Sequence, residues 1–287
     1  MWIMFSLTAA FSSATADALT KKHFSHLTAY EMGAFRLIYT LPWLGISMLF
    51  IPWPPIDRGF FLAIACGLPL EILAIWCYMK AIKISPLSLT LPFLAFTPIF
   101  MIITGWIMLG EKITLPGIIG IVLIVIGSYG LNLSQVKSGI WGPIKAVVKE
   151  KGSRMMLLVA FIYSITSTIG KLGVLHSSPS FFGITYFTCL SLLMLGALPL
   201  VPGAKVGRIA SKPSAGLVLG IIYAIMIFSH MLAISMVQAA YMISIKRVSL
   251  LFGVLYGAFL FREENIAERL GGAIIMVAGA LIIGYFG

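Results

Sequence analysis

The chain has 287 residues, of which 60% are hydrophobic and 10% are charged, and its mean hydropathy is +1.05. Soluble domains carry about 25% charged residues, so this composition excludes a soluble globular protein and predicts an integral membrane protein. A formal charge of +11 would favour a nucleic-acid partner in a soluble chain. Here the basic residues are scattered through loops without interleaved aromatic residues, so we expect no nucleic acid to bind.

Ten apolar runs, each long enough to cross a bilayer as a helix, follow one another along the chain. They cover residues 1–20, 29–51, 59–81, 86–109, 114–134, 155–174, 180–201, 214–236, 239–261 and 266–286. Most connections between them are too short to hold a soluble domain. We therefore predict an all-α membrane protein with ten transmembrane helices.

Basic residues in the connections are concentrated on one side of the predicted bilayer. That side holds Lys21, Lys22, Lys80, Lys83, Lys137, Lys145, Lys149, Lys151, Arg154, Lys205, Arg208, Lys212, Arg262 and Arg269, and the other side holds Arg58, Lys112 and Lys171. Because cytoplasmic loops are enriched in Lys and Arg, both termini are expected outside and residues 135–154 in the cytoplasm. We expect a multi-pass protein of the cell membrane, specifically the bacterial inner membrane.

The polar segment 135–154 separates two blocks of five predicted helices, residues 1–134 and 155–287. The blocks share identities at offsets of 150 and 152 residues, among them Ala10, Phe11 and Lys21 with Ala160, Phe161 and Lys171, and Gly105, Glu111, Gly120 and Gly127 with Gly257, Glu263, Gly272 and Gly279. Because five is odd, the second block enters the membrane inverted. Inverted repeats are typical of secondary transporters, whose substrate site lies near the midplane between the repeats.

Glycines and prolines indicate packing surfaces and flex points. The last predicted helix of each block is rich in glycine, which favours close packing between helices rather than a binding site. These glycines are Gly117, Gly120, Gly127, Gly130, Gly271, Gly272, Gly279 and Gly284, and Gly253 and Gly257 of the ninth run are interpreted in the same way. Pro86, Pro92 and Pro98 in the fourth run are candidate flex points, since kinks usually occur at proline.

Two segments carry a family resemblance. They are LPFLAFTPIFMIITGWIMLGEKI (91–113) and ISIKRVSLLFGVLYGAFLFREEN (243–265), each of which ends in Glu before the last helix of its block. With ten helices in inverted five-helix blocks, they make the whole chain resemble the EamA branch of the drug/metabolite transporter superfamily. The resemblance implies alternating access to a central cavity lined by the first four helices of each block, with the fifth and tenth helices packed outside it.

Lys246 and Arg247 are adjacent in the middle of the ninth run, where each charge costs roughly 2.5–3.5 kcal/mol unless it faces water, a partner or a ligand. We interpret the pair as a site for an anionic group, because Arg offers a planar fork and Lys a compact charge. The alternative is a structural pair neutralised by carboxylates. Sugar-phosphate translocators, distant members of the superfamily, carry a phosphate-binding Lys-Arg pair in the ninth helix, and this similarity implies Lys21 or Lys22 and Lys171 as further binding residues.

Glu71 follows Pro69 near the middle of the third run. Proline removes a backbone donor, and membrane proteins tolerate the carbonyl left unbonded where the backbone lines a cavity. Glu71 is therefore a candidate for proton coupling or for binding a substrate amine, and the alternative is a counter-ion for Lys246 or Arg247. A further anion near the basic pair argues against a phosphate group.

Three other ionisable residues have competing interpretations. Asp17 and Lys21 are four residues apart on one helix face, which favours a local ion pair. Arg36 either extends toward the cytoplasmic interface or faces the cavity. His230 is retained as a proton-coupling candidate, although core packing or a hydrogen bond is the favoured interpretation because no carboxylate or Cys lies at ligand spacing.

Several smaller groups complete the candidate site. Ser244 and Ser249 lie one turn from the basic pair and extend its polar surface. Four aromatic residues are interpreted either as stacking on a substrate or as interfacial and lipid-facing: Trp76, Tyr78, Tyr223 and Tyr241. Cys66, Cys77 and Cys189 lack metal-ligand spacing, so we expect buried apolar side chains and no metal site.

The predicted function is secondary active transport of a small polar, anionic or zwitterionic metabolite. The cargo would be an amino acid or organic acid if Glu71 binds an amine, and a phosphoester otherwise, driven by a proton or sodium gradient or by exchange. Proton-coupled efflux of cationic or amphipathic drugs is the alternative, with a channel or non-transporting scaffold as an alternative of another class. No Walker, HExxH, GxSxG or CxxC motif occurs, so we expect no enzymatic activity and no cofactor. The protein is expected to be a monomer or a homodimer.

Overall fold

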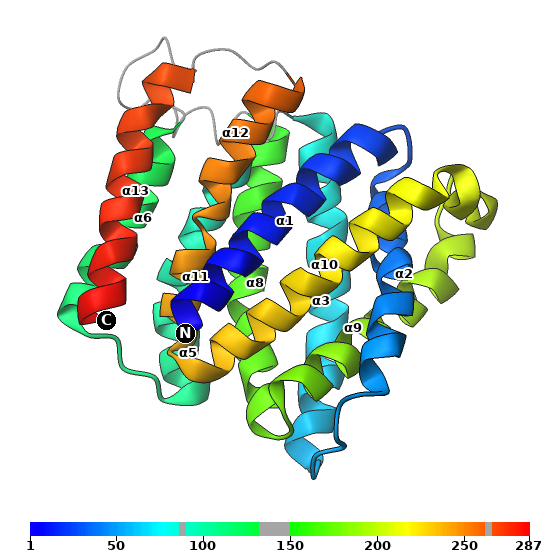
Figure 1. Ribbon diagram of the computed structural model, residues 1–287, viewed down its shortest axis with the longest axis horizontal. Coiled ribbons are helices and arrows are strands. Elements are labelled where there is room, and N and C mark those ends of the chain that lie inside the picture. The colour runs from blue at the N-terminus through cyan, green and yellow to red at the C-terminus, as the bar shows by residue number, and fades with distance from the viewer. Residues whose placement is uncertain (86–89, 132–149, 262–265) are drawn as a thin grey trace.

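The computed structural model describes residues 1–85, 90–131, 150–261 and 266–287, and the regular elements in these ranges are helices (Figure 1). The α-helices are α1 (Trp2–Phe24), α2 (Ala29–Met48), α3 (Arg58–Ile84), α5 (Thr97–Leu109), α6 (Leu115–Gly130), α8 (Lys151–Leu175), α9 (Pro179–Ala197), α10 (Pro213–Met236), α11 (Ala239–Lys246), α12 (Ser249–Phe261) and α13 (Ile266–Phe286). Three short 3-10 segments are η1 (Leu91–Phe96), η3 (Leu198–Leu200) and η4 (Val206–Ser211).

Six helical stretches are long and apolar enough to cross a membrane. They are Arg58–Ile84, Leu91–Leu109, Lys151–Leu175, Pro179–Leu200, Pro213–Met236 and Ala239–Leu260, and Leu115–Gly130 and Gly271–Phe286 are shorter apolar helices. Helices α1 and α2 have 23 and 20 residues but are more polar. The chain is a multi-pass, all-helical membrane protein, as its composition predicted.

Polar side chains cap several of these helices. Thr28 accepts a hydrogen bond from the backbone N–H of Glu31 at 3.2 Å, while the Glu31 carboxylate accepts from the N–H of Thr28 at 2.8 Å. Asp57, Glu150 and Ser178 cap α3, α8 and α9 in the same manner. Each cap satisfies N–H groups that have no partner within the helix, so the predicted spans begin within a few residues of their expected positions.

Two of the predicted spans are interrupted. Run 86–109 consists of the 3-10 segment η1 followed by α5, with Pro92 in η1 and Pro98 in the first turn of α5, whereas Pro86 lies outside the described residues. Run 239–261 is divided between α11 and α12 at Arg247 and Val248. At the break the N–H of Val248 bonds to the carbonyl of Ile245 at 3.0 Å, a shorter-range pattern than in an α-helix.

Helices α6 and α13 pack against each other at the left of Figure 1 through backbone contact. A Cβ atom at Gly127 would lie 2.6 Å from the carbonyl oxygen of Gly272, and one at Gly279 would lie 2.6 Å from that of Gly120. These four positions confirm the packing interpretation of the glycine-rich runs. Gly271 does not, because nothing lies within 4 Å of an added Cβ there.

Two lysines make matching contacts in the two predicted blocks. Lys21 Nζ donates to the backbone carbonyl of Ser85 at 3.2 Å, and Lys171 Nζ donates to that of Val237 at 2.6 Å. The donors are 150 residues apart and the acceptors 152 residues apart, the two offsets that relate the blocks. The two chain ends lie near each other in the lower left part of Figure 1. The division into two inverted repeats and the assignment of the cytoplasmic side stay predictions, and Glu263 and most of segment 135–154 lie outside the described residues.

Candidate functional site

A cavity of about 110 Å³ lies between the helices of the two blocks. Its lining residues come from α1, α2, α3, η1, α8, α9, α10, α11 and α12, and from Arg247 between the last two. Neither α6 nor the described side chains of α13 contribute to the lining, so these two helices pack outside it. The volume is smaller than the roughly 300–1,000 Å³ of typical ligand pockets, which restricts this conformation to a small cargo.

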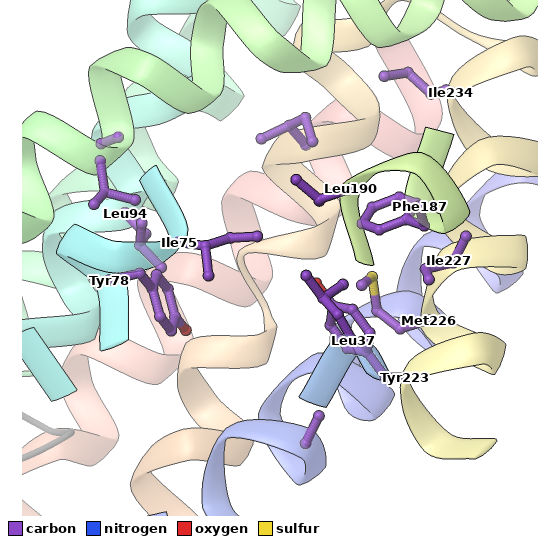
Figure 2. Close-up of a cluster of buried hydrophobic side chains, with 14 of the residues drawn as sticks. Leu37, Ile75, Tyr78, Leu94, Phe187, Leu190, Tyr223, Met226, Ile227 and Ile234 are labelled. Atoms are coloured by element: carbon purple, nitrogen blue, oxygen red, sulfur yellow. The ribbon is translucent and has the colours of Figure 1, made fainter. Parts of the chain in front are cut away.

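Apolar and aromatic side chains form much of the cavity wall (Figure 2). Figure 2 shows Leu37, Tyr223 and Met226 gathered on one side of the cluster and Tyr78 and Leu94 on the other. Tyr78 and Tyr223 therefore face the cavity rather than lipid. Such a wall excludes water and strengthens the interactions of the few charged groups that remain.

The basic pair lines the cavity with neutral partners. Lys246 Nζ lies 3.0 Å from His230 Nδ1 and 3.5 Å from the sulfur of Met226. Arg247 Nη2 donates to the Thr97 hydroxyl at 2.8 Å, and the buried Nε of Arg247 has no hydrogen-bond partner. Within the described residues neither side chain forms an ion pair, so the interpretation as a pair neutralised by carboxylates is not supported by any direct contact.

The helix break fixes where these groups point. Lys246 ends α11, Arg247 lies in the turn, and Ser249, which also lines the cavity, begins α12. A cation in the last turn of a helix interacts favourably with the partial negative charge of that end. Ser244, by contrast, is buried and donates to the carbonyl of Ala240, so it does not extend the polar surface of the site.

Glu71 lines the same cavity from α3. Thr166 of α8 and Lys246 line the cavity near it. Among the described residues no ion pair within 4 Å joins Glu71 to Lys246 or Arg247. Glu71 therefore interacts with Lys246 at longer range rather than through a direct contact.

Asp17 and Arg36 form a buried ion pair in the cavity wall. Arg36 Nη2 lies 2.8 Å from Asp17 Oδ1, and the Tyr78 hydroxyl donates to Asp17 Oδ2 at 2.5 Å. Arg36 also donates to Thr20 and lies over the ring of Tyr223 at 5.2 Å. The expected local pair of Asp17 with Lys21 is wrong, and Arg36 does not extend to the interface, because α2 brings a guanidinium directly against the carboxylate.

Lys171 and Lys21 lie outside the cavity lining, unlike the sequence-based expectation. Lys171 pairs with Glu111, whose carboxylate oxygens also accept from the backbone N–H of Ala239 at 3.2 and 2.9 Å. Lys21 contacts the carbonyl of Ser85. Both lysines are therefore engaged at helix ends, where they stabilise the junctions between helices rather than face the cargo space.

Tyr241 also lies outside the cavity lining. It is completely buried, and its hydroxyl accepts from the backbone N–H of Thr114 at 2.9 Å and packs on Gly117. Trp76 is exposed on the outer surface of α3, with the Lys80 ammonium 4.7 Å from its ring centre. These two aromatic residues thus have structural or interfacial positions.

The cysteines only partly match their expected burial. Cys77 is buried, Cys189 is half-buried and Cys66 is exposed on α3, where a small apolar side chain is compatible with a lipid-facing surface. In the described part of the chain no group of three or more His, Cys, Asp or Glu side chains is arranged to hold a metal ion.

The repeat offsets could have identified one lining residue that the sequence analysis missed, Tyr186, and they also relate two that it had named, Tyr223 and His230, to the first block. Adding 150 to Arg36 gives Tyr186, and adding 152 to Glu71 and Tyr78 gives Tyr223 and His230; all of these line the cavity. The signal was therefore present in the sequence as symmetry. The 152-residue offset also relates Thr97 to Ser249, but the contact of Thr97 with Arg247 is created by the fold alone.

Comparison with known proteins agrees with this geometry. Residues 1–133 match the model of the EamA-like transporter family. The match covers less than half of the chain, and over these residues the chain is similar to that family. This similarity indicates a membrane transporter of the drug/metabolite type.

The fold extends over the second half as well. A crystal structure described only as that of a protein, one of 28 matching chains, superposes with a TM-score of 0.71 over 98% of this chain and 96% of its own at 14% identity. At that identity the likeness shows the fold alone. No curated protein matches the sequence.

Proposed function

We propose that this EamA-like protein is a secondary active transporter that moves a small polar, anionic or zwitterionic metabolite by alternating access through the central cavity. The observation that carries the proposal is the position of Lys246 and Arg247, which line the cavity at the break in the ninth span with neutral partners only. Broken helices beside a midplane site are typical of transporters that bind charged cargo.

The charge balance of the cavity supports an anionic group on the cargo. Asp17 and Arg36 neutralise each other, and Lys246 and Arg247 outnumber the single carboxylate of Glu71. One net positive charge in a largely apolar site is costly, and an anion removes that cost. A carboxylate offers Arg247 the planar acceptor that its guanidinium matches.

Glu71 is the proposed coupling group. When ionised it can bind an amine of a zwitterion, and when protonated it leaves the basic pair uncompensated and favours a more highly charged anion such as a phosphoester. Proton coupling, sodium coupling and exchange would thus depend in different ways on the protonation state of Glu71. His230 is proposed to position Lys246 through its Nδ1 contact rather than to relay protons.

Efflux of cationic or amphipathic drugs is the second candidate, because aromatic rings and a carboxylate bind organic cations and the cavity contains Tyr78, Tyr163, Tyr186, Tyr223 and Glu71. A channel or a non-transporting scaffold is the candidate of another class, which saturable uptake would exclude. The same proposal includes transport without chemical change of the cargo, a location in the bacterial inner membrane, and a monomeric or homodimeric state.

A thermal-shift screen of the purified protein tests the proposal, since a ligand that binds the folded state raises its apparent stability. The panel contains amino acids, organic acids, phosphoesters and quaternary amines. We expect anionic or zwitterionic compounds to raise Tm and Lys246→Ala to abolish the shift, whereas the matched control Lys80→Ala, outside the cavity lining, retains it. Shifts by quaternary amines alone, unaffected by Lys246→Ala, would support the drug-efflux alternative.

A further inference from the structure

Two buried side-chain polar atoms lack a hydrogen-bond partner in the described residues, and both belong to side chains that line the central cavity. They are the hydroxyl of Tyr186 and Nε of Arg247. More than nine in ten buried polar atoms in folded proteins have a partner, and each exception destabilises the fold unless something else supplies one. Their coincidence in one cavity indicates that the cargo supplies both partners.

The two atoms are held by different elements. Arg247 follows α11 and is anchored to Thr97 at the start of α5 through Nη2, which leaves Nε–H free to donate. Tyr186 lies on α9, where its ring stacks on Phe182 at 5.4 Å and meets the edge of Phe187 at 5.5 Å. Both donor groups are therefore held in place before a ligand binds. Among the described residues, no neighbouring side chain forms a hydrogen bond with either of them.

The Tyr186 hydroxyl lies on the wall that carries Glu71. A Cβ atom at Gly67 would lie 2.9 Å from the hydroxyl oxygen, so the hydroxyl packs directly against the backbone of α3. Gly67 and Glu71 are four residues apart and share a face of that helix. The absence of a side chain at Gly67 provides the space that the Tyr186 hydroxyl occupies, one helical turn from Glu71.

We propose that the cargo has two separate polar groups: an anionic oxygen that accepts from Arg247 Nε and Lys246, and an uncharged hydroxyl or carbonyl oxygen that pairs with Tyr186. Tyr186 is then the residue that selects short hydroxy or oxo anions over plain anions of the same charge. This inference rests on the proposed anion transport and names the substrate class of the same site.

Matched ligand pairs test the inference in the purified, full-length protein. The first pair is propionate and lactate, and the second is ethyl phosphate and 2-hydroxyethyl phosphate; each pair differs by one hydroxyl group. Wild-type protein should bind the hydroxylated member of at least one pair about two- to tenfold more tightly, the range for one hydrogen bond between uncharged groups. Tyr186→Phe should remove this preference, whereas Lys80→Ala, outside the cavity lining, should keep it.

The outcomes separate this inference from the proposed function. If the wild type binds both members of a pair equally, with Arg247 still required, the anion site stands and the hydroxyl selectivity is wrong. If none of the four anions binds, both the anion site and its selectivity fail.

A ligand-free measurement tests the inference from a second direction. Tyr30 is a matched control, because its buried hydroxyl donates to the carbonyl of Met194 at 3.0 Å. Without ligand, Tyr30→Phe should lower Tm by about 2 °C or more, whereas Tyr186→Phe should leave Tm unchanged or raise it. A drop of Tm in Tyr186→Phe equal to that in Tyr30→Phe would mean that the hydroxyl already has a partner in the empty protein, which overturns the inference.

Discussion

Arg247 is positioned by a single uncharged side chain, the hydroxyl of Thr97. This contact joins the break in the ninth span to the start of α5, so it connects the two interrupted helices. Hydrogen bonds to charged groups contribute about 1.5–3 kcal/mol. We therefore expect Thr97→Val to weaken anion binding roughly tenfold or more, measured as Kd in a thermal-shift titration.

Thr97→Ser is the control for this prediction, because it keeps the hydroxyl and removes only a methyl group. It should retain most of the affinity that Thr97→Val loses. Equal affinities for Thr97→Val and the wild type would show that Arg247 does not depend on this contact.

Asp17 should be far more important for stability than its exposed counterpart Asp57. Removing one partner of a buried ion pair costs about 3–5 kcal/mol because the other charge stays buried, and the side chains of Asp17 and Arg36 are 5% and 6% exposed. Asp17→Asn should therefore lower Tm strongly. Asp57→Asn makes the same chemical change in a surface pair with His176, where ion pairs contribute little, and it should leave Tm nearly unchanged.

Asp57 remains a suitable control at neutral pH because the hydrogen bond with His176 lowers the pKa of this carboxyl. Its carboxylate is thus ionised under the conditions of the measurement and accepts the hydrogen bond from His176. If the two Asn variants melt at the same temperature, the Asp17–Arg36 pair is not a stabilising part of the cavity wall.

At the residue scale the sequence predicted which polar side chains line the cavity better than it predicted which residues they pair with. Lys246, Arg247, Glu71, His230 and Ser249 all line the cavity, as a charge or polar group inside an apolar run suggests. The pairing of Asp17 could not be predicted, since a helix-spacing rule considers only neighbours on the same helix, and the actual partner comes from another.

At the element scale, Glu111 explains the acidic turn that the family resemblance singled out. The first residue after α10, Val237, and the N-cap Gln238 offer no side-chain cap to α11. Instead the Glu111 carboxylate, from the turn between α5 and α6, accepts from the N–H of Ala239 and pairs with Lys171. The turn therefore caps a helix of the other block.

Glu111→Leu should destabilise the protein by about 3–5 kcal/mol, because it leaves the buried ammonium of Lys171 without its carboxylate partner. The double variant Glu111→Leu with Lys171→Met removes both charges and should recover part of the loss. Thermal unfolding of both variants measures this difference. A double variant no more stable than Glu111→Leu alone would show that the cap, rather than the ion pair, dominates.

The α6–α13 contact should affect stability without affecting cargo binding. Gly127→Val places a Cβ 2.6 Å from the carbonyl oxygen of Gly272, so the helices must separate. We expect a lower Tm with an unchanged Kd for the anion, since Gly127 lies outside the cavity lining. Gly271→Ala, where nothing lies within 4 Å of the added atom, is the control and should keep Tm; a weaker Kd in Gly127→Val would contradict the separation of packing from binding.

Hydropathy predicted where helices cross but not where they break. The run 239–261 is uniformly apolar around Lys246 and Arg247 and contains no proline, so nothing in its periodicity indicates the change of hydrogen-bond pattern at residues 247 and 248. In the run 86–109 three prolines gave a signal, and the 3-10 segment η1 contains one of them. A break without proline depends on tertiary contacts, here the anchoring of Arg247 to Thr97.

At the scale of the whole molecule, composition and span lengths were sufficient for the membrane fold, and the EamA-like family and the superposed crystal structure agree with it. The charges of the cavity are distributed unevenly between the two predicted blocks. The first block supplies Asp17, Arg36 and Glu71, whereas the second supplies His230, Lys246 and Arg247. A cargo with an anionic end would therefore be held between unlike walls, so that it contacts both blocks at once.

Counterflow in proteoliposomes tests the central claim most directly. Vesicles containing the wild type are preloaded with an unlabelled anion that raises its Tm, and accumulation of the labelled anion is followed over time, with Lys246→Ala as the test variant and Lys80→Ala as the control. We predict saturable accumulation by the wild type and Lys80→Ala, and a loss of about tenfold or more in Lys246→Ala, the effect of removing one charged hydrogen-bond donor. Accumulation by Lys246→Ala equal to that of the wild type would contradict the anion site at the break of the ninth span.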